Sequence, residues 1–492
     1  MVENISKKVN RATVWSSITE LIAKVVPPIV NMILARLLST SAFGLVATIT
    51  VVTSFADVFT DAGFQKYIIQ REFENDEELD RSTTVAFWSN LSLSTFVVLI
   101  IALFRNQIAY FVGSPGLGLG ITVASLSILA TAFSSIQMAR YKRDFDFKTL
   151  FFVRMGATLI PLVITVPLAM ILKSYWALVI GNLSVAFFNA IVLTIKSKWK
   201  PKLFYSFDLF KQMFSFSFWS LLESISVWFT SYIGVFIVGR YLTDHYLGLY
   251  NTSLSTVNSY MAIITSAITP VLFSALSRYQ NDEKMFKDTF YKFQRLTAVL
   301  IIPMGIGIFV FSDLVTIILL GKKWLEASGF IGLWGLMSAV FIVLCMYNSD
   351  VYRGKGKPRI SLIFQVLNLF VLVPALLISV KYGFETLYIV RSLTKIPSII
   401  LGFIFMQAVF KFKWFDSVKN IAPSVICACV MGIIGFLLKQ FSDNIAYQFV
   451  VIAACVVIYF SLIFVLFKDL RREIFSIPQI QNILKKLKII KN

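Results

Sequence analysis

Long apolar runs separated by short polar segments follow one another along almost the whole chain. Fourteen of them are long enough to cross about 30 Å of hydrocarbon as a helix. The pattern predicts an all-α integral membrane protein with about fourteen transmembrane helices. The runs lie at about 12–37, 42–65, 82–104, 118–139, 149–172, 175–195, 212–239, 246–276, 290–311, 328–350, 360–380, 383–409, 418–438 and 445–467.

The distribution of lysine and arginine gives the runs an orientation. With the N-terminus placed in the cytoplasm and the sides alternated, 34 of the 46 Lys and Arg residues fall on the inner side and 8 on the outer side. Every inner segment then carries more of these residues than every outer loop, as the positive-inside bias requires. We therefore expect a multi-pass protein with its N- and C-termini in the cytoplasm.

The overall composition agrees with a membrane protein. Hydrophobic residues make up 57% of the chain and charged residues 15%, whereas soluble domains carry about 25% charged residues. A net charge of +20 would suggest nucleic acid as the partner of a soluble protein. Here, positive loops facing anionic lipid account for the charge, so membrane lipids are expected partners and nucleic acid is not.

Few residues suit catalysis or metal binding. His245 is the only histidine, and the four cysteines all lie in apolar runs without the spacing of a metal pair. The loops are too short to hold an extramembrane catalytic domain, and the sequence contains no P-loop. We expect a protein that is not an enzyme and that uses neither a metal nor another cofactor.

An internal repeat divides the chain. The segment ARLLSTSAFGLV in the first half matches GRYLTDHYLGLY in the second, so that Arg36 meets Arg240 and Gly44 meets Gly248 at a shift of 204 residues. At nearly the same shift, the sequence Asn-Asp-Glu recurs. The matches predict two homologous halves of six helices each, related in parallel because six is an even number.

The repeat sets the expected domain organisation. We predict an N-terminal six-helix lobe at 1–205, a C-terminal six-helix lobe at 206–413 and two extra transmembrane helices at 414–467. The remaining residues, 468–492, carry an apolar stripe beside lysines and are predicted to form a cytoplasmic amphipathic tail, with a solvated tail as the alternative. Two parallel halves around a central cavity are a layout of alternating-access transporters.

The first apolar run contains the unusual stretch ELIAKVVPPIV. Glu20 and Lys24 are four residues apart with the acid first, so the two are predicted to neutralise each other. Lys24 is also a candidate phosphate ligand, and Glu20 a candidate for binding a coupling ion. Pro27 and Pro28 cannot donate backbone hydrogen bonds, which predicts a bent, cavity-lining helix with its hinge at these two prolines.

Several short motifs carry a resemblance to a known group. They are ARLL (35–38) with FGLVA (43–47), and GF (63–64) with IIQR (68–71). In these motifs the chain resembles polysaccharide flippases of the multidrug/oligosaccharidyl-lipid/polysaccharide exporter superfamily, in the Wzx-like branch that includes colanic- and teichuronic-acid-type exporters. The chain has STSA at 39–42, where the family usually has Thr/Gly-Pro-Glu-Asp.

The resemblance implies a function. It implies that an undecaprenyl-diphosphate-linked oligosaccharide repeat unit moves from the inner to the outer leaflet of the bacterial cytoplasmic membrane by alternating access. The product would serve capsule, exopolysaccharide or other surface-glycan assembly, with a glycan polymerase and glycosyltransferases of the same pathway as partners.

Three other readings remain open. A cation-coupled drug or small-solute exporter of the same superfamily is the main alternative, although the two extra helices and the Wzx-like motifs argue against it. A membrane enzyme such as a polysaccharide polymerase or ligase would be expected to carry a large external loop. A scaffold within a glycan-assembly complex is the third reading.

A substrate with a diphosphate needs cations inside the membrane. Arg391 and Lys395 lie four residues apart on one face of the twelfth run and repel each other unless an anion satisfies them, so they are candidates for a phosphate or an acidic sugar. The alternative is that Lys395 snorkels or pairs with an acid. Arg154 and Arg140 are further candidates, with a snorkelling anchor and a topology-setting charge as the alternative roles.

Acids inside the membrane are candidates for coupling. Asp57 and Asp61 share one face of the second run, and two adjacent carboxylates in a low dielectric should not both carry a charge. Together with Glu20 and Glu223, they are candidates for coupling transport to a proton or Na⁺ gradient. Pairing with Lys24 or another cation is the alternative.

Overall fold

The computed structural model describes residues 23–61 and 64–467. The side chains of residues 59–61, 215–220, 223 and 358 lie outside this description. Within the described ranges every regular element is a helix, and no strand occurs there. The all-α prediction is therefore confirmed.

A helix at residues 23–37 comes first. The elements that follow are α2 (Thr40–Asp61), α3 (Phe64–Gln70), α4 (Asp76–Leu103), α5 (Arg105–Phe111), α6 (Gly118–Arg143), α7 (Phe147–Ile160), η1 (Pro161–Thr165), α8 (Val166–Leu172), α9 (Trp176–Lys196), α10 (Phe207–Tyr241), α11 (Asp244–Arg278), α12 (Glu283–Val310), α13 (Ser312–Leu319), η2 (Lys322–Ala327), α14 (Ser328–Phe341), η3 (Ile342–Met346), α15 (Asn348–Gly354), α16 (Pro358–Ser379), η4 (Val380–Tyr382), α17 (Phe384–Leu393), α18 (Lys395–Phe410), α19 (Trp414–Lys439) and α20 (Ile445–Leu466).

The helices reproduce the predicted membrane spans. Among the described residues, 12 helical segments are long and apolar enough to cross a membrane, and each coincides with a predicted run. The remaining two predicted runs contain the helix at 23–37 and the long helix α10. The prediction of a polytopic protein with about fourteen transmembrane helices is confirmed in this outline.

Three of the predicted spans are interrupted helices. The fifth contains a π-turn, η1, that begins at Pro161, and the tenth contains a second π-turn, η3. The twelfth divides at Thr394 into α17 and α18. Proline lacks an N–H and its ring clashes with the carbonyl four residues earlier, so Pro397 explains why the helix does not continue through Leu393.

The helices form two compact units. Among the described residues, unit 1 falls within the ranges 1–256 and 365–387, and unit 2 within 257–364 and 388–492. These units follow spatial compactness, whereas the predicted lobes at 1–205 and 206–413 follow the internal repeat. The lobes, the extra pair of helices at 414–467 and the tail at 468–492 therefore stay predictions.

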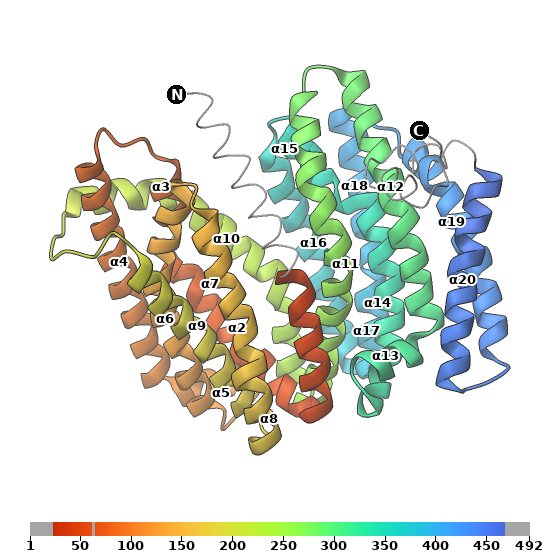
Figure 1. The fold of residues 1–492 in the computed structure, drawn as a ribbon, viewed down its shortest axis with the longest axis horizontal. Coiled ribbons are helices and arrows are strands. Elements are labelled where there is room, and N and C mark those ends of the chain that lie inside the picture. The colour runs from red at the N-terminus through yellow and green to blue at the C-terminus, as the bar shows by residue number, and fades with distance from the viewer. Residues whose placement is uncertain (1–22, 62–63, 468–492) are drawn as a thin grey trace. The chain divides into compact units, whose positions relative to one another are not determined.

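In unit 1, α6 lies between α4 and α9 and also contacts α2 (Figure 1). The buried face of α6 is rich in small residues, among them Gly120, Ala132 and Ser135. Small side chains let helix backbones approach closely, which is the usual way that membrane helices associate. Asn90 of α4 donates a hydrogen bond of 2.9 Å to Ser135 Oγ and ties the two helices together.

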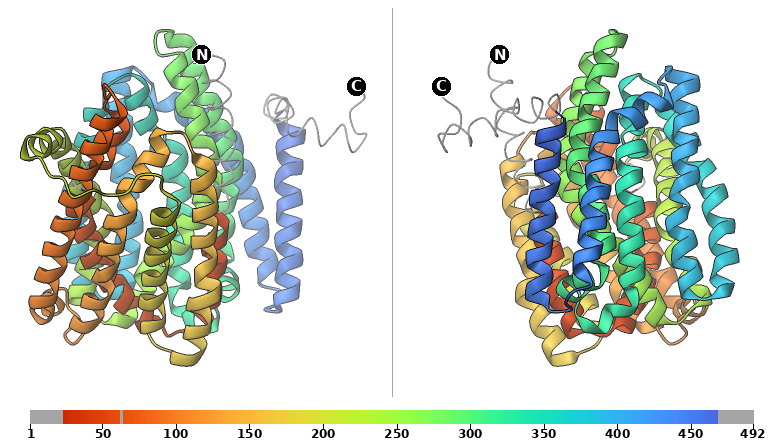
Figure 2. Two further views of the ribbon diagram at one scale, coloured as in Figure 1. Left: turned by 60° about the vertical axis from the view of Figure 1, so that its left-hand side comes forward. Right: turned by 90° about the vertical axis from the view of Figure 1, so that its right-hand side faces the viewer.

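In unit 2, α12 packs against α14 and α19, and α19 packs against α20, as the right-hand view of Figure 2 shows for the last pair. Glycines again mark the contacts, because a Cβ added at Gly305 would lie 2.3 Å from Ala339 Cβ. The Tyr459 hydroxyl of α20 donates a 2.8 Å hydrogen bond to the Val299 carbonyl of α12.

The repeat-related glycines Gly44 and Gly248 face each other within unit 1. A Cβ added at Gly44 would lie 1.9 Å from the carbonyl oxygen of Asp244, and one added at Gly248 would lie 1.9 Å from that of Thr40. Thr40 and Asp244 are themselves 204 residues apart. The first turns of α2 and α11 thus cross in a near-symmetric contact that only glycine permits.

The first predicted span is helical without interruption from residue 23 through Pro27 and Pro28 to residue 37. Lys24 is half-buried on this helix. Glu20 lies outside the described residues, as does the tail. The Glu20–Lys24 pair and the hinge at the two prolines remain predictions.

Candidate functional site

Arg391 and Lys395 meet on the face of one tryptophan. In unit 2, the Arg391 guanidinium carbon lies 4.8 Å from the centroid of the Trp334 ring, and the Lys395 ammonium lies 4.5 Å from it. Lys395 also lies 4.1 Å from the centroid of Phe341. The expectation that the two cations share one side of the twelfth span agrees with this geometry.

The local sequence fixes both cations. Arg391 stands in the last turn of α17, and Lys395 is the first residue of α18. Thr394 lies between them, and its hydroxyl donates a 2.6 Å hydrogen bond to the Arg391 carbonyl. The break that Pro397 causes therefore lies between the two cations and sets their relative position.

A hydrogen bond also holds the Trp334 ring in place. Trp334 is 2% exposed, and its indole N–H donates a 3.1 Å hydrogen bond to Asn258 Oδ1. With the N–H occupied, the ring offers its π face to the two cations. Such contacts are worth about 0.5–2 kcal/mol each, the larger value applying away from water.

The tenth span, which carries Trp334 and Phe341, also contains a helix irregularity and an unusual polar group. The π-turn η3 separates Phe341 from Asn348, and π-turns frequently occur at functional sites. Asn348 is buried, and its amide nitrogen has no hydrogen-bond partner among the described residues. Across from it, a Cβ at Gly402 would lie 2.9 Å from that nitrogen, so α18 approaches closely here.

The charge of this cluster is unbalanced at Lys395. Among the residues that the structure describes, no carboxylate lies within ion-pairing distance of its ammonium group. The alternative that Lys395 pairs with an acid therefore finds no support in the described part of the chain. A guanidinium and an ammonium on one ring are suited to bind an anion with several oxygens, such as a phosphate.

Arg140 has an internal counter-ion. It forms an ion pair with Asp80 of α4 and lies 6.0 Å from the centroid of Trp199. Its side chain is 18% exposed. This environment favours a structural role for Arg140 over the substrate contact that the sequence left open.

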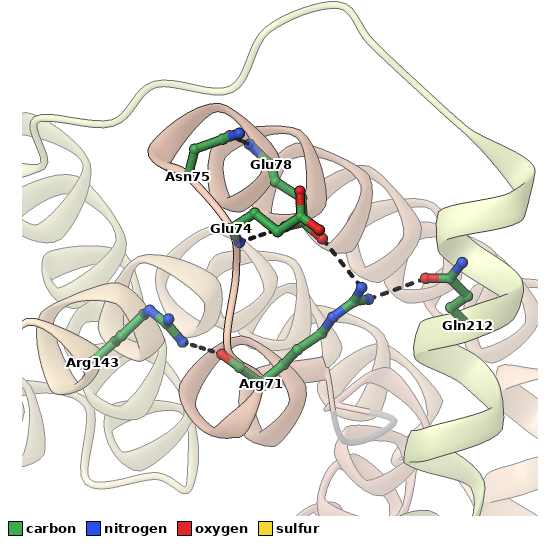
Figure 3. Close-up of polar contacts among 6 residues, drawn as sticks. All are labelled: Arg71, Glu74, Asn75, Glu78, Arg143 and Gln212. Atoms are coloured by element: carbon green, nitrogen blue, oxygen red, sulfur yellow. Dashed lines mark hydrogen bonds and ion pairs between the residues drawn. The ribbon is translucent and has the colours of Figure 1, made fainter.

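A second network at the same end of unit 1 is also structural (Figure 3). Arg71 donates hydrogen bonds to Glu78 at 3.1 Å and to Gln212 at 3.0 Å, which joins α10 to α4. Arg143 donates a 2.6 Å bond to the Arg71 carbonyl. Asn75 caps α4 by accepting a bond from the Glu78 N–H. These groups satisfy one another and fix the loop between α3 and α4.

The other candidates belong to unit 1 or lie outside the description. Arg154 is exposed on α7, and Asp57 is half-buried on α2. The side chains of Asp61 and Glu223 belong to those that the structure does not describe. Their roles as ligand or coupling residues remain predictions.

The sequence did not predict that the Trp334 ring contacts both Arg391 and Lys395. Trp334 lies 57 residues before Arg391, and no periodicity links the two. In a chain that is 15% aromatic, a single tryptophan gives no distinguishing signal. Asp80 was likewise missed as the partner of Arg140, because the two belong to different helices.

Comparison with known proteins places this fold among a recognised group. A model of the family described as polysaccharide biosynthesis protein matches residues 33–329, which is more than half of the chain. The chain is 24% identical over 372 residues to the lipopolysaccharide biosynthesis protein WzxC of Escherichia coli (strain K12), covering 74% of this chain and 73% of that protein.

Two further similarities cover more of the chain. It is 20% identical over 448 residues to the teichuronic acid biosynthesis protein TuaB of Bacillus subtilis (strain 168), covering 90% of this chain and 92% of that one. Among solved structures, the lipid II flippase MurJ in an inward closed conformation superposes with a TM-score of 0.73 at 15% identity, covering 92% of this chain and 99% of that one. At this identity, the structural likeness shows a shared fold.

Proposed function

Because the chain belongs to the polysaccharide biosynthesis protein family, we propose that it is a flippase for an undecaprenyl-diphosphate-linked oligosaccharide repeat unit. It moves this unit from the inner to the outer leaflet of a bacterial cytoplasmic membrane, for assembly of a capsule, an exopolysaccharide or another surface glycan. Glycosyltransferases of the same pathway would act before it, and a glycan polymerase would act after it.

Two kinds of similarity support the proposal. The relatives WzxC and TuaB are named for lipopolysaccharide and teichuronic acid biosynthesis. The fold matches that of a lipid II flippase over nearly the whole chain. The interrupted, largely apolar helices suit a protein that moves parts of its transmembrane region rather than one that carries out chemistry.

The observation that carries the proposal is the pair of cations on Trp334. An isolated charge in hydrocarbon is very costly, so a diphosphate crosses a membrane only with compensating charge beside it. Arg391 offers planar, paired donors to phosphate oxygens, and Lys395 offers a compact positive charge. In our proposal, these two residues bind the diphosphate while the glycan passes through a polar path between the predicted lobes.

The energy source in this proposal is an ion gradient. No nucleotide-binding loop occurs in the sequence, and Asp57, Asp61, Glu20 and Glu223 are the acids proposed to bind a proton or Na⁺. Transport in sealed vesicles should respond to an imposed pH or Na⁺ gradient. Equal rates with and without either gradient would remove these acids from the mechanism.

The direct test of the site uses proteoliposomes that contain the purified full chain and a fluorescent polyprenyl-diphosphate oligosaccharide. The double variant Arg391→Gln/Lys395→Gln should translocate at least about tenfold more slowly, because it loses two charge-assisted contacts of about 1.5–3 kcal/mol each. The readout is the fraction of glycan that becomes accessible to a lectin on the far side.

A matched control removes equal charge from the ends of the same span. Lys381 and Lys413 are exposed and flank α17 and α18, so Lys381→Gln/Lys413→Gln should translocate like the original chain. Size-exclusion profiles establish that both variants insert and fold. If the two double variants transport equally fast, Arg391 and Lys395 do not form the phosphate site.

A further inference from the structure

A small basic pocket lies at one end of unit 2, where α12 begins, α15 meets α16, and α18 ends. Its volume is about 190 Å³, several times the roughly 30 Å³ that one water occupies in the liquid. Four lysines line it, Lys287, Lys355, Lys357 and Lys411, together with a single carboxylate, Glu283. The pocket therefore carries a formal excess of three positive charges.

Aromatic rings hold three of these lysines in place. The Lys355 ammonium lies 4.5 Å from the centroid of Phe286, and the Lys287 ammonium 5.5 Å from that of Phe412. Lys357 lies 5.6 Å from the centroid of Phe410. Cation–π contacts restrict side chains that would otherwise extend freely into water.

The end of α18 shapes one wall of the pocket. Lys411 adopts a left-handed conformation with φ 57°, and the Phe412 N–H donates back to the Met406 carbonyl at 3.1 Å. This is the hydrogen-bond pattern that ends many helices by turning the chain back. It directs Phe412 onto α12, where its ring lies 5.2 Å from that of Phe290.

Backbone carbonyls hold two of the lysines at their tips. Lys355 donates a 2.7 Å hydrogen bond to the Gln280 carbonyl, and Lys287 donates a 3.3 Å bond to the Lys411 carbonyl. Both lysines are half-buried as residues, and their ammonium groups are accessible from outside. Each ammonium group has three donors, so further donors remain for a ligand.

Unit 1 contains a related arrangement with a different charge. Asn75 caps α4 and Asp282 caps α12 in the same way, each accepting a bond from the N–H three residues later. Five residues after these caps stand Asp80 and Lys287 respectively. In unit 1, Asp80 neutralises Arg140, whereas in unit 2 a lysine stands at the same distance from the helix cap.

Each unit also has a cation at a helix end that donates to a backbone carbonyl. Arg143 donates to the Arg71 carbonyl in unit 1, and Lys355 donates to the Gln280 carbonyl in unit 2. A cation therefore holds a backbone carbonyl in front of the capped helix in both units. Five residues after the cap, however, unit 1 has the acid Asp80 and unit 2 has the cation Lys287. The pocket in unit 2 therefore has an excess of positive charge that a negatively charged ligand would balance.

The position and lining of the pocket indicate what that ligand is. The three loops that form it are among the segments that the Lys and Arg bias assigns to the cytoplasmic side, where the leaflet is anionic. Val409 and the phenylalanines make roughly half of its wall apolar. A free phosphate would gain nothing from such a wall, whereas a phosphate that carries a glycerol backbone and acyl chains would.

We propose that this pocket binds the phosphate headgroup of an anionic phospholipid from the cytoplasmic leaflet. The four lysines contact the phosphate oxygens, and the aromatic wall contacts the glycerol and the first acyl carbons. The site is separate from the Trp334 cluster and does not depend on which substrate the protein moves.

Native mass spectrometry of the purified full chain tests the proposal, with phosphatidylglycerol and zwitterionic phosphatidylcholine as probes. The original chain should retain phosphatidylglycerol in preference. Lys287→Gln/Lys355→Gln should bind it about 30-fold more weakly, since each lysine near a membrane surface contributes about a fivefold factor. Lys284 and Lys292 lie on the same helix, are exposed and do not line the pocket, so Lys284→Gln/Lys292→Gln serves as the charge-matched control and should bind normally.

A second variant keeps the test valid if the first one folds poorly. Lys287→Asp introduces the residue type found at the same distance from the helix cap in unit 1, and it should fold while losing the preference for phosphatidylglycerol. The proposal would be overturned if Lys287→Asp bound phosphatidylglycerol as well as the original chain does. It would also be overturned if the pocket and control double variants lost equal affinity for phosphatidylglycerol.

The same experiment distinguishes the source of the phosphate. Farnesyl diphosphate, as a short prenyl diphosphate, and glycerol phosphate are added as competitors. Neither should displace phosphatidylglycerol at equimolar concentration. Displacement by farnesyl diphosphate would mean that the pocket binds the diphosphate headgroup of the substrate. Displacement by glycerol phosphate would mean that the acyl chains contribute nothing to binding. Either result would contradict the assignment to a phospholipid.

Discussion

At the scale of single residues, Trp334 organises the candidate site. Its ring is the common contact of Arg391 and Lys395, and Asn258 holds its N–H. Because the ring is almost fully buried, its loss would leave both a cavity and two cations without their aromatic partner. The site therefore depends on a residue that is itself uncharged.

We predict that Trp334→Ala lowers stability strongly and Trp334→Phe only mildly. Truncating a buried tryptophan typically costs about 3–5 kcal/mol, whereas phenylalanine keeps an aromatic face for the cations. Thermal unfolding followed by size-exclusion chromatography measures the difference. Equal melting temperatures for the two variants would show that the ring is not needed there.

The residues of the site were predictable only in part. The spacing of Arg391 and Lys395 placed both cations on one side of a span, because that relation is local to a helix. Trp334 and the Asp80 partner of Arg140 come from other helices, and tertiary contacts of this kind leave no trace in periodicity. The sequence also gave no sign that a helix break at Thr394 separates the two cations.

At the scale of helices, the crossing of α2 and α11 is the most restrictive contact. Gly44 and Gly248 each face a backbone carbonyl of the other helix, and backbone cannot move aside as a side chain can. The sequence revealed these glycines as repeat-related positions. It did not reveal that they touch, because a repeat relates positions without stating their distance.

Gly44→Ala and Gly248→Ala should each destabilise the protein by about 1–3 kcal/mol or more, as overpacking of a close contact does. Gly307→Ala on α12 is the matched control, because a Cβ there meets nothing within 4 Å. Melting temperatures of the three variants provide the measurement. Unchanged stability at both crossing glycines would mean that the helices do not cross this closely.

The apolar pattern of the sequence predicted the long helices but not the short ones. Long apolar runs predicted the spans, since helices must satisfy their own backbone in lipid. The short helices α3, α5 and α13 and the two π-turns were not predicted, because each spans only a turn or two. Such segments are set by neighbouring contacts rather than by a repeated apolar face.

At the scale of the whole molecule, the orientation in the membrane is a prediction that rests on charge alone. Inner segments of the predicted topology carry most of the lysine and arginine. The basic pocket has its proposed role only if it faces the cytoplasm. The sidedness is therefore a premise of the phospholipid proposal.

Cysteine labelling of intact cells tests the orientation. After the four native cysteines are replaced, Lys381→Cys should react with a membrane-impermeant maleimide added outside. Lys357→Cys should react only after the membrane is permeabilised. The reverse pattern would invert the topology.

The most direct measurement of the central claim is the leaflet distribution of lipid-linked oligosaccharide in cells with and without this protein. In cells lacking the protein, repeat units should accumulate on the cytoplasmic leaflet and the surface polymer should be lost. Re-expression of the original chain should restore both, and the Arg391→Gln/Lys395→Gln variant should restore neither. A normal leaflet distribution and a normal surface polymer in cells that lack the protein would contradict the account.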